Sequence, residues 1–341
     1  MNAPRHVLSI MVVTLNEAEH LPLLKQALDR LHRPEGWTLE TILVDGGSRD
    51  GTVEAAAELG FDQFLMYPGA SIPVCRNHAL HAAHGDALAF LDGDCLPAPN
   101  WLQEAAPYLV RVEPTLLGYP VQPPPEGNWI QRSWHAHWAH KNAHARSTRQ
   151  EPVSKDAFRL ITTRNMLFNR LLLEVAPAFD ESLSTGEDTD FAFRATQAGA
   201  CVLAVPALNV IHLGEPATLS QYFRQQLWHA NRKAYATILK SGGGKNGANA
   251  VFFSFAFLAG LIFAIVGLLL ALLRWNAGFL LLLLPLAIVT LLPAAWISRR
   301  ARSFRLFCRL CILYFLYGLA RAIDLVGLSP RKASWKFPAR I

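Results

Sequence analysis

Two aspartates separated by one glycine follow the apolar run Ala87–Phe90, where the sequence reads Leu91-Asp92-Gly93-Asp94. Because such runs form buried strands, both carboxylates are expected at the carboxyl end of a strand, where open α/β sheets bind ligands. Mg²⁺ and Mn²⁺ prefer carboxylate oxygens and take further ligands from phosphates and water. The pair is therefore a candidate for holding a divalent cation against a nucleoside diphosphate, although Asp-Gly-Asp is also ordinary turn chemistry.

Other polar residues follow further apolar runs in the same way. Those that follow the first run, Val7–Val13, are Thr14, Asn16 and Glu17. Asp45 follows the run Glu40–Val44 and opens a turn rich in glycine. A later acidic cluster, Gly186-Glu187-Asp188-Thr189-Asp190, precedes a helix expected from about Phe191 to Gly199.

The elements that must position these residues alternate along the chain. Strands are expected at Val7–Val13, Glu40–Val44, Gln63–Met66 and Ala87–Leu91, and helices at about residues 18–31, 52–59 and 72–84. Such alternation is typical of a parallel sheet with right-handed crossovers. The carboxyl ends of parallel strands share one edge, so the polar residues are expected to meet there.

Regular patterning stops between Leu116 and Gln150, where prolines and tryptophans are frequent. His137, His140 and His144 would share one face of a helix, which makes a metal site conceivable. No acid or cysteine accompanies them between residues 137 and 149. A solvated or substrate-contacting helix is therefore the favoured interpretation.

The C-terminal part of the chain is strongly apolar. Hydrophobic residues make up 52% of the whole sequence and charged residues only 17%, and residues 250–273 and 277–297 contain no charge. Each run exceeds the roughly 20 residues that a helix needs to cross a bilayer. We expect two membrane spans joined by a tight turn at Arg274-Trp275-Asn276, with buried helices of a soluble protein as the alternative.

Basic residues flank the segment that follows these spans. The residues that directly follow the second span are Arg299, Arg300, Arg302, Arg305 and Arg309, of which the last two already lie in the third segment, and those of the tail are Arg331, Lys332, Lys336 and Arg340. Both flanks are expected to be cytoplasmic, so residues 304–328 are interpreted as an interfacial or re-entrant helix rather than a third span. The net charge of +6 then indicates attraction to an anionic membrane surface, and nucleic acid is not an expected partner.

The N-terminal residues show no signal peptide, because a strand pattern and polar turn residues follow Met1–Arg5 directly. The globular part is therefore expected to stay in the cytoplasm. The five cysteines form no disulfide framework, which fits a reducing compartment. Cys308 and Cys311 have CxxC spacing, but they lie in a membrane-associated segment without a second ligand pair, so zinc is not expected there.

Residues 218–240 combine aromatic and basic side chains in the pattern of an interfacial amphipathic helix, and residues 242–247 form a glycine-rich linker. The expected organisation is a catalytic domain over residues 1–217, this helix and linker over 218–249, two spans over 250–298, and a basic C-terminal segment over 299–341.

Taken together and in this order, five motifs resemble the family 2 glycosyltransferases of GT-A fold, over about residues 6–235. The motifs are Thr14-Leu15-Asn16-Glu17, Val44-Asp45-Gly46-Gly47-Ser48-Arg49-Asp50-Gly51-Thr52, Arg76-Asn77, Asp92-Gly93-Asp94 and Gly186-Glu187-Asp188-Thr189-Asp190. The chain is most similar to membrane-anchored members that build bacterial surface polysaccharides and glycolipids. The resemblance implies an α/β, Rossmann-like nucleotide-diphospho-sugar transferase domain followed by C-terminal transmembrane helices.

The resemblance also implies which residues bind the nucleotide. Asp45 matches the uracil-contacting acid, and Thr14, Asn16 and Glu17 match the loop along the nucleoside. Arg76 matches a basic residue near the base or diphosphate, and Asp92 an acid that faces the ribose. Structural alternatives are a turn cap from Asp45 to Ser48, helix capping by Asn16 or Glu17, and a surface salt bridge for Arg76.

Metal binding and proton removal are assigned by the same resemblance. Asp94, with Asp92 beside it, matches the ligands of Mg²⁺ or Mn²⁺, and His212 matches the third ligand, although a lone strand-end histidine can be purely structural. Asp188 matches the general base, and Glu187 beside it could raise its proton affinity. Helix capping by these acids is the alternative. One base without a covalent nucleophile implies inversion.

Arg224 and Arg232 fall where processive relatives carry Gln-x-x-Arg-Trp, a motif from which this chain departs. They are expected to contact either the diphosphate or lipid headgroups. The expected function is metal-dependent transfer of a sugar, from a nucleotide-sugar that we take to be UDP-linked, to a lipid-linked or membrane-associated acceptor at the inner (cytoplasmic) membrane.

A polyprenyl-phosphate sugar synthase is the alternative, but such enzymes usually show Asp-Leu-Gln-His-Pro-Pro where this chain reads Asp94-Cys95-Leu96-Pro97-Ala98-Pro99. A non-catalytic nucleotide-sugar-binding membrane protein is the second alternative. The motifs name neither the sugar, nor the acceptor, nor any protein partner.

Overall fold

The computed structural model describes residues 6–141, 157–183, 186–230 and 245–328. By their internal contacts these residues form two compact units. The globular unit comprises the described residues up to Pro125 and from 157 to Glu215, and the helical unit comprises Glu126–Lys141 and the described residues from Pro216 onwards. Residues 126–141 thus interrupt the stretch 1–217 that the sequence pattern assigned to one domain.

The globular unit is built on a seven-stranded sheet of order β3-β2-β1-β4-β7-β6-β8. Its strands are β1 (His6–Thr14), β2 (Trp37–Asp45), β3 (Gln63–Met66), β4 (Ala87–Asp92), β6 (Thr115–Gly118), β7 (Met166–Asn169) and β8 (Cys201–Ala204). A second, two-stranded sheet pairs β5 (Cys95–Pro97) with β9 (Val210–His212). The helices are α1 (Leu21–Asp29), α2 (Thr52–Glu58), α3 (Ile72–Ala82), α4 (Trp101–Leu109) and α6 (Glu187–Gln197), with 3₁₀ turns η1 (Ala157–Leu160), η2 (Thr163–Asn165) and η3 (Arg170–Glu174).

The main sheet is mixed rather than wholly parallel. β1 to β4 are parallel as predicted, but β7 is antiparallel to both β4 and β6. The parallel arrangement predicted for the first four strands is confirmed, and the antiparallel β7 lies outside that prediction. The reason for its direction is the point of entry: β7 starts at Met166 opposite Phe90, near the carboxyl end of β4, so the chain must run back across the sheet. Because η2 directly precedes β7, it lies at the edge formed by the carboxyl end of β4.

Alternating side chains of the central strand β1 enter two different cores. Ile10 and Val12 belong to a buried cluster with residues of α1 and α4, whereas Met11 and Val13 belong to a cluster with residues of α3 and α6. A strand with apolar side chains on both faces is typical of a sheet covered by helices on both sides. Ligand access is thereby restricted to the strand ends.

Three helix boundaries differ from the sequence prediction. α1 begins at Leu21 rather than near Ala18, with a proline in its first turn. α6 begins at Glu187 rather than Phe191, so its acids lie inside the first turn. Negative charges are favourable there because backbone N–H groups point outward at a helix N-terminus. α9 (Lys245–Arg274) begins within the expected linker.

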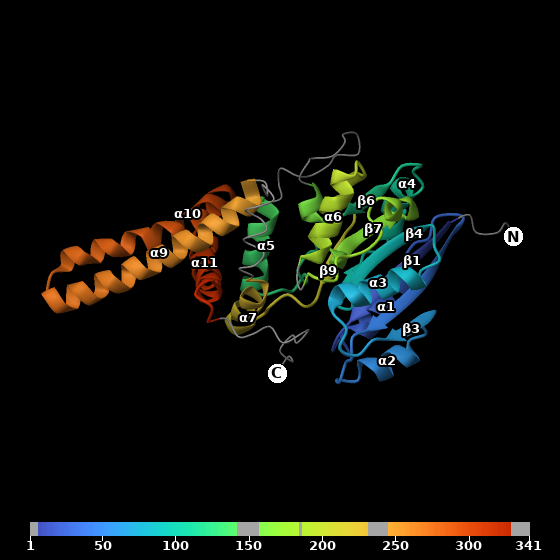
Figure 1. Ribbon diagram of the computed structural model, residues 1–341, viewed down its shortest axis with the longest axis horizontal. Helices are drawn as coiled ribbons and strands as arrows, with labels where there is room; N and C mark the ends of the chain where they lie inside the picture. The colour runs from blue at the N-terminus through green and yellow to red at the C-terminus, as the bar shows by residue number, and fades with distance from the viewer. Residues whose placement is uncertain (1–5, 142–156, 184–185, 231–244, 329–341) are drawn as a thin grey trace. The chain divides into compact units, whose positions relative to one another are not determined.

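The helical unit contains α5 (Trp129–Lys141), α7 (Leu219–His229), α9, the 3₁₀ segment η4 (Ala277–Leu283), α10 (Leu284–Ala301) and α11 (Phe304–Leu325). α9 and α10 lie side by side (Figure 1). α5, α7 and α11 share an aromatic core of Ile130, Trp134, Tyr222 and Leu313. This core explains why residues 126–141 belong to the helical unit.

Three helices of this unit are long and apolar enough to cross a membrane: Val251–Arg274, Ala277–Ala301 and Phe304–Leu325, with mean hydropathies of 2.9, 2.5 and 1.7. The first two coincide with the predicted spans. For the third, the sequence favoured an interfacial or re-entrant segment, whereas the structure shows an unbroken helix of 22 residues. Part of the expected amphipathic helix 218–240 is seen as α7, which ends at His229, and residues 231–240 lie outside the described residues.

Candidate functional site

Strand register brings three predicted residues to one edge of the main sheet. Thr14, the last residue of β1, pairs with Asp45, the last residue of β2. Asp92 ends β4 opposite Val13 of β1. The three polar side chains therefore follow adjacent parallel strands at their carboxyl ends, as the sequence pattern predicted.

Asp45 is fully buried and acts as a turn cap. Its Oδ1 atom accepts hydrogen bonds of 2.8 Å from the backbone N–H groups of Gly47 and Ser48. Its Oδ2 atom accepts from the hydroxyls of Ser48 and of Thr14, the latter at 3.3 Å. The structural alternative considered for Asp45 is thus realised, and contact with a base stays a prediction.

The loop after β1 is tied to the loop after β2. Asn16, at φ 58°, accepts a 2.9 Å hydrogen bond from the Arg49 N–H, and the Asn16 N–H donates to Ser48 Oγ. The Glu17 N–H donates to Thr52 Oγ1 at 2.8 Å, and the Glu17 carboxylate contacts His20 at 2.8 Å. Neither side chain caps α1, whose N-cap is His20. The two loops form one wall beside Thr14 and Asp45.

The Asp92-Gly93-Asp94 turn packs closely against this wall. A Cβ atom at Gly93 would lie 2.9 Å from Thr14 Cγ2 and 3.1 Å from Glu17 Cγ. Contacts that close are not tolerated, so a side chain at this position would push the turn away from the wall. Glycine therefore sets the spacing between the two aspartates and the expected nucleoside loop.

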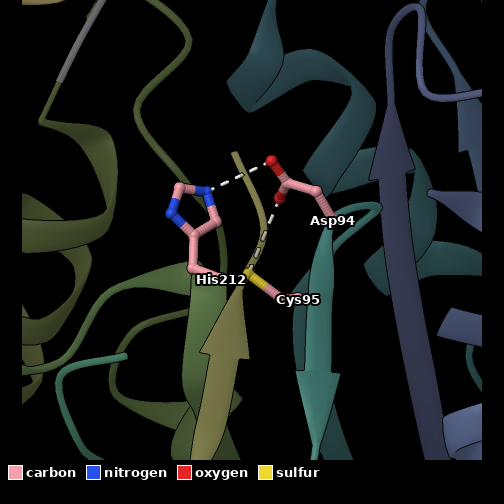
Figure 2. A group of neighbouring side chains, drawn as sticks. All are labelled: Asp94, Cys95 and His212. Atoms are coloured by element: carbon pink, nitrogen blue, oxygen red, sulfur yellow. Dashed lines mark hydrogen bonds and ion pairs between the residues drawn. The ribbon is translucent and has the colours of Figure 1, made fainter. Parts of the chain in front are cut away.

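The small sheet brings His212 to Asp94 from more than a hundred residues away. Cys95 of β5 pairs directly with His212 of β9, and the Leu213 N–H donates to the Asp94 carbonyl at 2.9 Å. His212 Nε2 lies 3.2 Å from Asp94 Oδ2, and the Cys95 thiol lies 3.7 Å from Asp94 Oδ1. Figure 2 shows the imidazole and the thiol approaching different oxygens of the same carboxylate.

Glu215 holds the other side of the imidazole and was not predicted from the sequence. Its Oε1 atom lies 2.9 Å from His212 Nδ1. Burial alone would lower the pKa of His212, but the carboxylates of Asp94 and Glu215 outweigh it and raise this pKa to about 10. Burial opposes the shift at Glu215 too, where the hydrogen bond from His212 lowers the pKa to about 2. The imidazolium therefore carries the positive charge between two carboxylates.

Arg76 is buried and joins two of the predicted acids. Its Nη1 atom contacts the buried Glu187 carboxylate, and its Nη2 atom lies 3.6 Å from Asp92 Oδ1. Burial lowers the pKa of an arginine, yet the charges of Glu187, Asp92 and Asp188 together raise it. The surface salt bridge considered for Arg76 is thus a buried one, and it connects α3 with β4 and α6.

Glu187 and Asp188 have different surroundings within the first turn of α6. Burial raises the pKa of Glu187, with Arg76 opposing and Asp188 adding to the effect. Asp188 is only partly buried, and its Oδ1 atom accepts a 2.7 Å hydrogen bond from the Thr189 N–H. Asp188 is therefore the more accessible of the two carboxylates, whereas Glu187 is held by Arg76.

Arg164 is a second unpredicted residue of this edge. Its guanidinium lies 3.3 Å from Glu215 and is 34% exposed. Burial acts to lower its pKa, but Glu215, with Asp92 and Asp188 farther off, raises it. The charges of Asp92 and Asp188 thus act on both Arg76 and Arg164, and planar guanidinium groups are well suited to binding phosphate oxygens.

Asn165 explains why Arg164 is held there. Its amide is fully buried and accepts a 2.9 Å hydrogen bond from Trp101 Nε1. It donates to the carbonyls of Tyr119 and Leu208 at 2.9 and 2.8 Å. This anchor could not be foreseen, because η2 has no periodic pattern in the sequence.

The two remaining predicted residues do not belong to the described part of the globular unit. Arg224 belongs to α7 of the helical unit, where its Nη2 atom contacts Ser220 Oγ at 3.0 Å. Arg232 lies outside the described residues. Their expected contacts with diphosphate or headgroups stay predictions.

The donor set suits a divalent cation. Ligand atoms of Asp94, Cys95 and His212 all lie within 4.8 Å of one another, and all three residues are buried. A carboxylate, an imidazole and an outer carboxylate that orients the imidazole recur in protein metal sites. Asp92 lies beside Asp94 in sequence but outside this trio, and its contact is with Arg76. Burial raises the pKa of Asp92, against the charge of Arg76.

Residues 9–174 match the model of glycosyl transferase family 2. The chain is 26% identical over 201 residues to the glycosyltransferase AglE of Haloferax volcanii, covering 56% of this chain and 62% of AglE. It is 34% identical over 130 residues to an undecaprenyl-phosphate 4-deoxy-4-formamido-L-arabinose transferase of Pseudomonas fluorescens, covering 35% of each. The chain thus spans less than two thirds of either relative. The match to the family model identifies residues 9–174 as a family 2 glycosyltransferase domain, which confirms the resemblance seen in the motifs.

The fold is shared with a solved structure of low sequence identity. The mannosyltransferase PcManGT from Pyrobaculum calidifontis, in complex with GDP-Man and Mn²⁺, aligns with a TM-score of 0.60 and 16% identity, covering 97% of this chain and 90% of that chain. This likeness confirms the predicted α/β GT-A class.

Proposed function

We propose that this protein transfers a sugar from a nucleotide diphospho-sugar to an acceptor in or on the membrane, with inversion at the anomeric carbon. One observation carries the proposal. Asp94 contacts His212, which is linked through Glu215 to Arg164, and Arg76 contacts both Asp92 and Glu187, the residue before the more accessible Asp188. Sugar transfer requires a diphosphate leaving group, positive charge that neutralises this diphosphate, and a base.

Donor binding is assigned to the wall and to the two arginines. Thr14, Asn16 and Glu17 would line the nucleoside, with Asp45 behind them holding the turn. Arg76 and Arg164 would approach the diphosphate, because each already pairs with a carboxylate that an incoming anion can replace or join. We expect a UDP-sugar, and GDP-mannose is a necessary comparison because PcManGT was solved with GDP-Man.

Asp94 and His212 would hold Mg²⁺ or Mn²⁺, with Asp92 beside them. When bound, such an ion neutralises charge that develops on the leaving diphosphate. Asp94 supplies the oxygen ligand that these ions prefer. His212 has its Nδ1 side satisfied by Glu215 and its Nε2 side turned towards Asp94.

Asp188 would take the proton of the acceptor hydroxyl as this oxygen attacks the anomeric carbon. Attack from the face opposite the diphosphate inverts the configuration, and one carboxylate suffices for it. Glu187 contributes through its ion pair with Arg76, which holds that guanidinium near Asp92.

The acceptor is proposed to be lipid-linked or membrane-associated. Three helices are long and apolar enough to cross a membrane, and one relative is named for transfer to undecaprenyl phosphate. Together with the basic segments of the sequence, this supports a multi-pass protein of the inner (cytoplasmic) membrane whose catalytic unit faces the cytoplasm.

The test is transfer by the detergent- or lipid-embedded protein with labelled UDP-sugars and GDP-mannose, Mn²⁺ and a membrane lipid extract. Asp188→Asn should lower the rate by about 10²- to 10⁴-fold, the range for loss of a general base, while nucleotide binding persists. Asp29→Asn, at an exposed position of α1, is the matched control. Wild-type activity in Asp188→Asn would overturn the assigned mechanism, and no product from any donor would overturn the function.

A polyprenyl-phosphate sugar synthase is the second candidate, supported by the 34% identical relative. A phosphate acceptor is already ionised, so its attack needs no base. If this candidate is correct, Asp188→Asn should retain most activity with a polyprenyl phosphate acceptor, and the product should be a sugar phosphodiester. Transfer to a hydroxyl gives a glycoside instead, and mass spectrometry of the product separates the two.

A further inference from the structure

The buried thiol of Cys95 lies beside Asp94 and His212, and the proposed site for Mg²⁺ or Mn²⁺ does not use it as a ligand. Cys95 is 0% exposed, and its Sγ atom shares the Asp94 carboxylate with His212 (Figure 2). These ions are hard and prefer oxygen, so a sulfur atom adds little to their binding. Aspartate, cysteine and histidine are instead ligands that zinc takes.

The ligand atoms lie close enough together for one cation of this softer class to reach all three. Zinc bonds of about 2.3 Å to sulfur and about 2.0–2.1 Å to nitrogen and oxygen place tetrahedral ligand atoms about 3.4 Å (N to O) and about 3.6 Å (S to O) apart. The structure shows 3.2 Å between His212 Nε2 and Asp94 Oδ2 and 3.7 Å between Cys95 Sγ and Asp94 Oδ1. The two contacts use different oxygens of the carboxylate, and all three ligand atoms lie within 4.8 Å of one another. Rotation of the side chains would therefore have to bring one carboxylate oxygen, the sulfur and the nitrogen to tetrahedral separations around a cation.

The backbone holds these ligands in place. Cys95 and His212 are direct partners in the antiparallel β5–β9 pair, and the Leu213 N–H donates to the carbonyl of Asp94. Glu215 contacts His212 Nδ1 at 2.9 Å, the outer contact that orients a metal-bound imidazole. The arrangement is thus set by strand pairing and not by a mobile loop.

We propose that Asp94, Cys95 and His212 bind a thiophilic divalent cation of the zinc class, leaving a fourth position for water or a substrate oxygen. The proposal rests on the proposed function, because the same pair would hold Mg²⁺ or Mn²⁺. On binding, the thiol proton and the imidazolium proton pass to solvent. Since two of the ligands are shared, a zinc-class cation and Mn²⁺ exclude each other.

The experiment uses Co²⁺ as a spectroscopic substitute for zinc on the purified full chain in detergent. Cys308 and Cys311 lie three positions apart in α11, about one helical turn, and could also bind Co²⁺. Every protein in the experiment therefore carries Cys308→Ser and Cys311→Ser. In this background, Co²⁺ should produce a near-ultraviolet thiolate-to-cobalt charge-transfer band. Excess Mn²⁺ should reduce the band.

Cys95→Ser should abolish the band and lower the affinity for Co²⁺ relative to Mn²⁺ by roughly 10- to 100-fold, as for other losses at metal sites. The matched control is Cys201→Ser. β8 runs in the same direction as β6, and β6 runs in the same direction as β4 because β7 is antiparallel to both. Cys201 is the first residue of β8, so it lies at the edge opposite to the carboxyl end of β4. Cobalt-edge X-ray absorption of the parent protein, which should report one sulfur at about 2.3 Å, does not depend on the variant folding.

Two results distinguish failure of the proposed thiol ligand from failure of the proposed function. If Mn²⁺ binds, as followed by its paramagnetic resonance, but Co²⁺ gives neither the band nor a sulfur neighbour, the thiol ligand is wrong and the proposed function stands. If neither cation binds, with or without UDP, the metal site of the proposed function fails as well.

Discussion

Glu215 connects two functional side chains and shows what a single residue contributes here. It contacts His212 Nδ1 at 2.9 Å and Arg164 Nη1 at 3.3 Å. The first contact sets which imidazole nitrogen is turned towards Asp94. The second holds a guanidinium at the same edge. Glu215 is therefore a positioning residue rather than a direct ligand.

Replacing Glu215 should weaken cation binding without removing a ligand. We expect Glu215→Ala to raise the Kd for Mn²⁺ by about 10- to 100-fold, the usual effect of losing an outer contact to a metal-bound histidine. Glu215→Gln should have a smaller effect, because its amide oxygen still accepts from His212. Calorimetric titration of Mn²⁺ measures both.

Glu58→Ala, at an exposed position at the end of α2, is the control for this series. Equal Mn²⁺ affinity in Glu215→Ala and wild type would contradict the positioning role.

Residue types and spacing predicted part of this edge and missed the rest. Asp92, Asp94, Glu187 and Asp188 stand in compact motifs that chemistry alone singles out. Arg164 and Glu215 belong to no such motif. Glu215 lies three residues after His212, and its proximity to that histidine was the one available signal.

At the scale of elements, Glu40 ties the amino-terminal half of the sheet together. Its carboxylate accepts from Ser9 Oγ of β1, from Gln63 Nε2 of β3 and from the His84 N–H before β4. Burial acts to raise the pKa of Glu40, but the hydrogen bonds from Ser9, His84 and Gln63 outweigh it and lower the pKa from 4.5 to about 2. The ionised form is thus the one that the fold stabilises.

This shift predicts a pH-dependent stability. A depressed carboxyl pKa contributes stability that is complete above the unfolded value near 4.5 and is lost as the pH falls towards 2. Glu40→Gln should therefore lower the free energy of unfolding by on the order of 2–3 kcal/mol at pH 7, and the difference from wild type should shrink below pH 4.5. Urea unfolding in detergent, followed by fluorescence across this pH range, measures it.

Glu54→Gln, exposed in α2, should show no such trend. A difference between Glu40→Gln and wild type that stays constant with pH would rule out ionisation of Glu40 as the cause.

Within the helical unit, Gly318 allows α11 to approach α9. A Cβ atom at Gly318 would overlap the ring of Phe257, which is fully buried. Small residues at helix contacts of this kind let membrane helices pack closely. We expect Gly318→Ala to lower the unfolding free energy by about 1–3 kcal/mol, the usual cost of overpacking, seen as a lower melting temperature in detergent.

The double variant Gly318→Ala/Phe257→Ala provides the control. If the ring is the obstacle, Gly318→Ala should cost less in the Phe257→Ala background than in wild type. Equal cost in both backgrounds would show that the contact is unimportant.

At the scale of the whole molecule, the number of membrane crossings determines on which side of the membrane the C-terminus lies. The three apolar helices would place the chain's C-terminus across the membrane from its globular unit if all three cross. The basic residues on both sides of α11 oppose that arrangement, because cytoplasmic segments carry the excess of lysine and arginine. We therefore expect the C-terminus on the cytoplasmic side.

C-terminal reporter fusions that are active on only one side of the membrane test this expectation. A cytoplasmic signal supports two crossings with α11 at the interface. A signal from the opposite side would establish three crossings. A fusion placed in the turn at Arg274-Trp275-Asn276 is the control, since both topologies put it on the far side.

The sequence by itself determined the family, the alternating elements β1 to β4, the acidic turns at their carboxyl ends and the two most apolar helices. These features arise from short-range patterns: period-2 and helical apolar spacing, glycine-rich turns and uncharged runs. Tertiary structure decided the rest, because it depends on contacts between distant segments. The antiparallel entry of β7 places Arg164 at the edge, the β5–β9 pair joins His212 to Asp94 and Cys95, and a buried ion pair joins Arg76 to Glu187. No local pattern specifies which distant strands pair, so this part of the site became visible only in the fold.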